Sequence, residues 1–245
     1  MRKNLLISAL SCLLLCACSE KFTPENAYGY LSPTLHFSEI VEDATKAMVS
    51  DYAPVPVPDD FTLIIKTDKG QEYWSGKIGD WSESIKMPVG RYVVAARWGV
   101  EGEEGFGKSW FGASEEVDIL MADTLKLSLN TQLGNCMVAV ASTEAFDAYF
   151  ADYNLTMTTG GGTIVAFPKS ETRPVFVEAF RFSLSGTVTT KTGKSYEFSK
   201  NFDGNLKPAT YYTIRLDADT IGGVKFIIQF DDQVENIVIE EDLNE

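Results

Sequence analysis

Few residues in this sequence are candidates for catalysis or metal binding. His36 is the only histidine in 245 residues, which excludes a zinc site built on two or three histidines and also the H-E-x-x-H pattern. No G-x-S-x-G pattern accompanies His36, which argues against a serine hydrolase. Asp217 and Asp219 begin a segment that is faintly similar to a calcium loop, but Ile228 stands where that loop requires a bidentate Glu. We therefore expect no catalytic residue, no metal and no cofactor.

The N-terminus predicts lipid attachment. Two basic residues precede an apolar run that is too short to cross a bilayer, which needs about 20 residues. The next residues, Leu15-Cys16-Ala17-Cys18, resemble a bacterial lipobox. We expect residues 1–17 to be a lipoprotein signal peptide, Cys18 to carry the lipid, and residues 18–28 to be the tether. Lipidation at Cys16 and an ordinary signal peptide are the alternatives.

Cys136 is the one cysteine that this processing leaves free. The two cysteines before Ala17 leave with the signal peptide and Cys18 carries lipid, so no disulfide can form within the folded chain. Cys136 lies in an apolar run, and we expect a buried small hydrophobic residue rather than a nucleophile.

Aromatic side chains flank a polar, glycine-containing loop at residues 100–109. Trp98 precedes the loop, and Trp110 and Phe111 follow it. An indole can stack on the apolar face of a sugar ring, and a loop with glycines can adapt to a ligand. Trp98, Trp110 and Phe111 are therefore the candidate ligand-binding residues. The alternative, which we favour, is that the two tryptophans cover the end of a core.

The charge and the strand pattern limit the class of protein. The net charge is -14, so a phosphate backbone would repel the chain and nucleic acid is not an expected partner. Short alternating runs of Val, Ile, Thr, Tyr and Phe are separated by Gly, Asp, Asn and Pro, which predicts an all-β fold. Residues 143–152 predict one short helix, with Thr143 as its N-cap.

About fourteen predicted strands indicate two tandem β-sandwich domains of transthyretin- or immunoglobulin-like type. We place the N-terminal sandwich at residues 29–132 and the C-terminal sandwich at residues 133–245. A single continuous sandwich is the alternative. The segment at residues 29–37 is the predicted first strand, and we expect Pro33 to interrupt its pairing and make it easier to displace. It is equally well interpreted as a permanent first strand.

Six segments together resemble a known family. They are GYLS (29–32), DDFTLIIKTDKG (59–70), MPVGRYVVAARWG (87–99), GFGKSWFGASEEVDI (105–119), TEAFDAYFADYNLTM (143–157) and PATYYTIRLDA (208–218). In order and spacing they resemble the Bacteroidetes lipoprotein family called domain of unknown function 4493, which is similar in build to fimbrillins and fimbrial anchor subunits. The resemblance implies a secreted, lipid-anchored β-sandwich protein and supplies no catalytic residues. Related shaft subunits are cut after an early Arg, whereas here no Arg occurs between Arg2 and Arg91, which favours a protein that keeps its anchor.

These observations predict a non-enzymatic, lipid-anchored outer-membrane protein that faces the cell surface and acts in adhesion or fimbria-like assembly. Its expected partners are the membrane, through Cys18, and fimbrial or other surface proteins. The alternative is a glycan-binding surface lipoprotein of a polysaccharide-uptake system, and a hydrolase comes third. Thr124 and Thr220 each follow an Asp and precede an aliphatic residue, which resembles the O-glycosylation sites of exported Bacteroidetes proteins.

Overall fold

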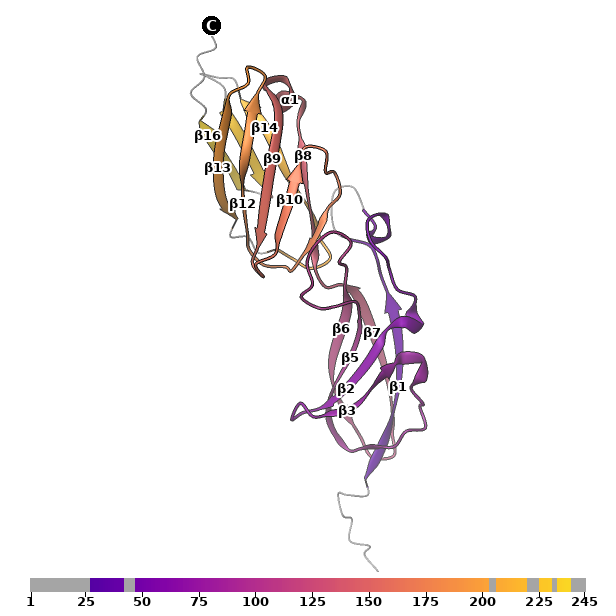
Figure 1. The fold of residues 1–245 in the computed structure, drawn as a ribbon. Helices are drawn as coiled ribbons and strands as arrows, with labels where there is room; N and C mark the ends of the chain where they lie inside the picture. The colour runs from indigo at the N-terminus through magenta and orange to yellow at the C-terminus, as the bar shows by residue number, and fades with distance from the viewer. Residues whose placement is uncertain (1–26, 42–46, 203–205, 220–224, 231–232, 239–245) are drawn as a thin grey trace, which may run out of the picture.

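The computed structural model describes residues 27–41, 47–202, 206–219, 225–230 and 233–238 (Figure 1). Its strands form two domains that lie end to end, and the first described strand begins at the pole away from the second domain (Figure 1). Cys18 and Thr220 lie outside the described residues, as does the predicted signal peptide.

The N-terminal domain contains seven strands and three short 3-10 helices. The strands join in the order β3-β2-β5-β6-β7-β1-β4. Strands β6 and β7 pair only at Phe111 and Gly112, so the two parts of this sheet separate and face each other across a core. The elements are β1 (Tyr28–Phe37), η2 (Val49–Asp51), η3 (Pro58–Asp60), β2 (Thr62–Thr67), β3 (Glu72–Lys77), η4 (Ile78–Asp80), β4 (Met87–Pro88), β5 (Gly90–Trp98), β6 (Phe111–Ile119) and β7 (Thr124–Leu133).

Strand β1 pairs with β7 in parallel, without a break from Tyr30 to Phe37. The amide of Tyr30 donates to the carbonyl of Asp123, just before β7, and the amide of Ser38 donates to the carbonyl of Thr131 in β7. Even-numbered residues of β1 therefore direct their backbone groups toward β7. Pro33 is odd-numbered, and its missing N–H would point to the opposite edge. The prediction that Pro33 interrupts pairing is therefore wrong, because proline is tolerated where its nitrogen faces away from the partner strand.

The C-terminal domain is a sandwich of two separate sheets. A four-stranded sheet has the order β10-β9-β12-β13, and a five-stranded sheet has the order β11-β8-β14-β15-β16. Inward side chains of both sheets form one apolar core that includes Leu155, Leu184 and Ile214. The elements are β8 (Cys136–Ser142), α1 (Glu144–Tyr149), β9 (Phe150–Thr159), β10 (Ile164–Pro168), β11 (Val175–Val177), β12 (Phe182–Thr190), β13 (Ser195–Phe202), β14 (Tyr211–Asp219), β15 (Lys225–Phe230) and β16 (Gln233–Val238).

The predicted fold class, two tandem all-β sandwiches with one short helix, is confirmed. Thr143 caps α1 by accepting a hydrogen bond from the amide of Phe146 at 3.1 Å, as predicted. The helix ends at Tyr149, earlier than the sequence predicts, because Phe150 already begins β9. Strands β11 and β12 follow one another in the sequence but belong to different sheets.

Apolar side chains cross from one domain into the other. Met137, Phe176 and Ala209 come from the C-terminal domain, yet they pack in the core of the N-terminal domain together with Phe111 and Leu133. Met137 and Phe176 are fully buried. The junction between the domains is therefore a packed interface and not a free linker.

Candidate functional site

The loop at residues 100–109, which we call the junction loop, connects β5 to β6 and lies against the C-terminal domain. Gly105 forms an isolated antiparallel bridge with Phe176, which belongs to β11. The amide of Gly105 donates to the carbonyl of Phe176 at 2.8 Å, and the amide of Phe176 donates back at 3.1 Å. The loop therefore adds a short piece of backbone to the edge of the five-stranded sheet.

Two carboxylates hold this contact. Oε1 of Glu178 accepts hydrogen bonds from the indole Nε1 of Trp110 at 2.8 Å and from the amide of Gly102 at 3.2 Å. Oε1 of Glu104 accepts from the amide of Glu178 at 3.0 Å, and Oε2 of Glu104 accepts from the hydroxyl of Thr159. The carboxylate of Glu178, in the C-terminal domain, thus accepts hydrogen bonds from the N-terminal domain, and the carboxylate of Glu104, in the N-terminal domain, accepts hydrogen bonds from the C-terminal domain.

Apolar contacts and one further amide complete the junction. The ring of Phe106 lies edge-on to that of Phe167, with centroids 5.7 Å apart, and the guanidinium of Arg173 lies 4.8 Å from the centroid of Phe106. The side-chain amide of Asn135 donates to the carbonyl of Lys108 at 2.8 Å. Since Asn135 and Phe167 belong to the C-terminal domain, the junction loop contacts that domain along most of its length.

The three candidate aromatic residues have separate surroundings. Phe111 is fully buried in the core of the N-terminal domain, so its ring presents no face to a ligand. Trp98 is half-buried and packs on Phe111, with centroids 6.0 Å apart. The indole of Trp110 lies directly on Gly134, where an added Cβ would come within 2.2 Å of the ring. Sugar binding by Trp98 and Trp110 stays a prediction, and the described contacts of Trp110 link the two domains.

The remaining predicted residues lie far from this junction or within a core. Cys136 is buried, its thiol donates to the carbonyl of Val177 at 3.5 Å, and burial raises its pKa to about 12. Thr124 is exposed at the first position of β7, where an enzyme could reach it. His36 is exposed on β1. Among the described residues, no group of three or more His, Cys, Asp or Glu side chains could hold a metal ion.

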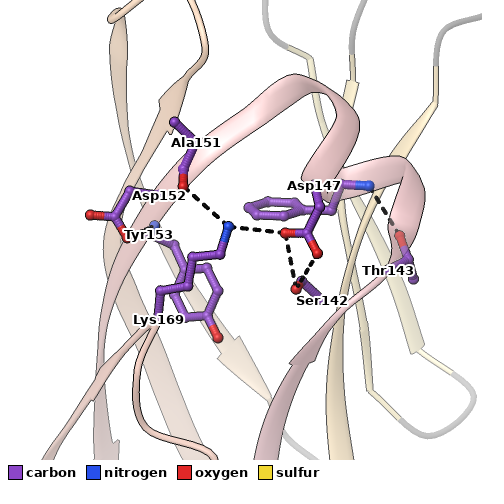
Figure 2. Close-up of polar contacts among 8 residues, drawn as sticks. Ser142, Thr143, Asp147, Ala151, Asp152, Tyr153 and Lys169 are labelled. Carbon is purple, nitrogen blue, oxygen red and sulfur yellow. Dashed lines mark hydrogen bonds and ion pairs between the residues drawn. The ribbon is translucent and has the colours of Figure 1, made fainter.

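A second polar cluster surrounds α1 (Figure 2). Asp147 accepts from the hydroxyl of Ser142 and pairs with the ammonium group of Lys169 at 3.0 Å. That ammonium also donates to the carbonyl of Ala151 at 3.1 Å. Because Asp147, Ser142 and Lys169 satisfy one another, the cluster fixes the helix against the neighbouring strands (Figure 2).

Sequence reasoning found the junction loop but missed its partner Glu178. The signal that could have found it is local: a single Glu follows the fully apolar run of β11, at the point where a buried strand ends. A charged residue there needs hydrogen-bond donors nearby. Which donors they are depends on segments more than 65 residues away, since Glu178 and Trp110 are separated by 68 positions.

The strands, the two cores and the junction define a class of all-β protein in which two sandwiches are joined end to end through a packed interface. The chain belongs to the family described as "Domain of unknown function (DUF4493)", whose sequence model matches residues 28–245. The resemblance inferred from the six sequence segments is thereby confirmed.

Solved structures with a similar chain path come from Bacteroidetes. A candidate polysaccharide-binding protein of Bacteroides thetaiotaomicron is 12% identical, with a TM-score of 0.45, over 86% of this chain and 99% of that one. A candidate adhesin of the same species is 9% identical, with a TM-score of 0.43, over 86% and 99%. The fimbrial anchor protein Mfa2 from Porphyromonas gingivalis is 14% identical, with a TM-score of 0.42, over 84% and 98%. No curated protein sequence matches the chain.

Proposed function

We propose that the protein is a non-enzymatic, lipid-anchored protein of the outer membrane that faces the cell surface and takes part in adhesion or fimbria-like assembly. The observation that carries the proposal is the open edge of β1. This strand has ten residues, but β4 covers its outer edge only at Tyr28 and Gly29. Beyond Gly29, no described strand pairs with that edge.

The open edge offers backbone groups to another strand. Odd-numbered residues of β1 direct their N–H and C=O groups away from β7. Among these residues, Leu35 and Phe37 each have an N–H and a C=O that pair with no backbone group of the described residues. Pro33 removes one donor, and the carbonyl of Leu31 accepts from the indole of Trp81 at 3.0 Å. The available groups therefore lie toward the C-terminal end of β1. An unpaired edge of this kind is a template for an added strand from a partner.

The position of β1 fits an anchored subunit. Strand β1 begins at Tyr28, and the predicted lipid site Cys18 precedes it by ten residues. Ten extended residues span at most about 35 Å, so the start of β1 would remain close to the membrane. Among the described residues, no helix is long and apolar enough to cross a bilayer, and in this proposal the anchor is the lipid.

Lysine substitutions at the edge test this function. Thr34 and His36 are exposed on β1, and charged side chains on an edge strand oppose the addition of another strand. We expect the variant Thr34→Lys/His36→Lys to lose cross-links to neighbouring surface proteins on intact cells, while its amount and thermal midpoint stay unchanged. The control Ser75→Lys places one positive charge on β3, the edge strand of the other part of the sheet, and is compared with each single β1 variant as well as with the double one.

The outcomes separate clearly. Loss of the cross-links in the β1 variant, with retention in the β3 variant, supports assembly through β1. If both variants keep the wild-type cross-links, or if the wild-type protein forms none, assembly through this edge is wrong.

A further inference from the structure

A row of uncharged polar side chains crosses one end of the four-stranded sheet in the C-terminal domain. Thr158, Ser183 and Asn201 lie directly opposite one another on β9, β12 and β13. Opposite residues of antiparallel strands share a face, and neighbouring strands are about 4.8 Å apart. Because Leu184 and Phe182 next to Ser183 are buried, the row lies on the outer face of the sandwich.

An aromatic ring and a guanidinium group border this row. Phe180 is 56% exposed, and its ring lies on Gly160, where an added Cβ would come within 2.3 Å of it. The guanidinium of Arg181 lies 5.5 Å from the centroid of the same ring. Arg181 lines an open cavity of about 280 Å³ together with Thr158, Thr159, Gly160, Phe182, Ser183 and Asn201. Phe180 is adjacent to this cavity, because its ring covers the lining residue Gly160.

The polar side chains of the cavity are available to a ligand. Thr159 is already engaged, since its hydroxyl donates to Glu104 of the junction loop. By contrast, Thr158, Ser183, Asn201 and Arg181 make no side-chain hydrogen bond or ion pair with any residue that the structure describes. In a chain with a net charge of -14, a guanidinium without a carboxylate partner is unusual, and it favours a ligand that brings its own negative charge.

We propose that this cavity binds one ring of an acidic sugar, a pyranose with a carboxylate group. The carboxylate would pair with the Arg181 guanidinium, whose planar fork matches it. The apolar face of the ring would contact Phe180, and the sugar hydroxyls would exchange hydrogen bonds with Thr158, Ser183 and Asn201. The volume suits a single ring, because it is just below the range of about 300–1,000 Å³ that is typical of small-molecule sites.

The outer face of the four-stranded sheet carries uncharged polar side chains beyond the cavity as well. The next row along the strands is Thr156, Ser185 and Ser199, again directly opposite one another. Successive rows on one face are about 6.8 Å apart, because outward positions alternate along a strand. Further rings of an acidic polysaccharide would therefore meet hydroxyl groups rather than charges. This site is separate from β1 and does not depend on the proposed function in assembly.

A matched pair of glycosides tests the proposal on the full-length protein in detergent. Methyl β-D-glucuronide and methyl β-D-glucoside differ only at the carboxylate, and ligand-detected saturation-transfer NMR gives the Kd of each. We expect the glucuronide to bind at least about tenfold more tightly than the glucoside, because a charge-assisted bidentate contact is added. Arg181→Gln should remove that difference, and Phe180→Ala should weaken both ligands.

Arg173→Gln is the matched control. Arg173 also lies over a phenylalanine, Phe106, but it pairs with Glu171 at 2.8 Å and is outside the cavity. The proposal is overturned if neither glycoside binds, if the glucuronide has no advantage over the glucoside, or if Arg181→Gln changes the Kd no more than Arg173→Gln does. Unchanged thermal midpoints of both exposed-arginine variants show that a loss of binding does not come from unfolding.

Discussion

Removing the carboxylate of Glu104 should uncouple the two domains. Glu104→Ala deletes two hydrogen bonds to the C-terminal domain, one from the amide of Glu178 and one from the hydroxyl of Thr159. A hydrogen bond to a charged group contributes about 1.5–3 kcal/mol. Two bonds therefore give at most about 6 kcal/mol, and water can replace part of this at a half-buried group, so we expect a loss of about 3 kcal/mol.

The distribution of tryptophan makes the effect measurable. All four tryptophans, Trp74, Trp81, Trp98 and Trp110, belong to the N-terminal domain. Tryptophan fluorescence in urea therefore follows that domain, whereas far-UV circular dichroism follows both. In the wild-type protein we expect the two curves to coincide, because the packed junction couples the domains. In Glu104→Ala we expect the two curves to have separate midpoints. The lower of the two midpoints should fall by about 1 M urea relative to the wild-type protein, because a loss of about 3 kcal/mol is divided by an m-value of about 3 kcal/mol/M.

Glu103→Ala is the control for this experiment. Glu103 is in the same loop, but it pairs with Lys108 of that loop at 2.6 Å and both side chains are more than 40% exposed. A surface ion pair contributes about 0.5 kcal/mol, so the two curves should still coincide. If Glu104→Ala behaves like Glu103→Ala, the carboxylates do not couple the domains, and the apolar contacts of Met137 and Phe176 must do so alone.

Three further predictions concern modification and reactivity. Cys18→Ser should move the protein from the membrane fraction to the soluble fraction, and retention after a carbonate wash would contradict lipidation. Cys136, whose pKa is raised to about 12 by burial, should stay protonated and unlabelled by a thiol reagent between pH 7 and 9 in the folded protein, and should react after denaturation; rapid labelling of the folded protein would reopen a reactive-thiol role. Mass spectrometry of the exported protein should show a glycan on Thr124 or Thr220, and an unmodified mass refutes both sites.

Local features of the fold could be predicted because neighbouring residues determine them. Gly70 has φ of +77° in the hairpin between β2 and β3, and Gly193 has φ of +89° in the hairpin between β12 and β13. Both positions need a backbone conformation that glycine adopts without a steric cost. The Thr143 cap of α1 follows from the same local chemistry.

Pairings between distant residues could not be predicted. Tyr30 pairs with Thr124, and no property of either segment identifies the other as its parallel partner. Whether β1 tolerates Pro33 also depends on this pairing, because the partner strand and its register determine which edge of β1 the proline nitrogen faces. The candidate site shows the same limit. The alternation of Ser183 and Ser185 with Leu184 predicts an outward hydroxyl face, but the neighbours of that face, Thr158 and Asn201, are set by strand register.

The parallel pairing of β1 with β7 also determines how the N-terminal domain responds to mechanical tension. The chain enters β1 at the pole of the molecule away from the C-terminal domain, and it leaves β7 toward that domain (Figure 1). A pull between the two poles therefore slides β1 along β7 in opposite directions. Eight paired positions, Tyr30–Thr124 through Phe37–Thr131, share that shear at the same time, whereas an antiparallel hairpin pulled at its open end separates one pair after another. A protein built in this way resists extension along its long axis, which under the proposed adhesive function is the direction in which a tethered cell would pull it.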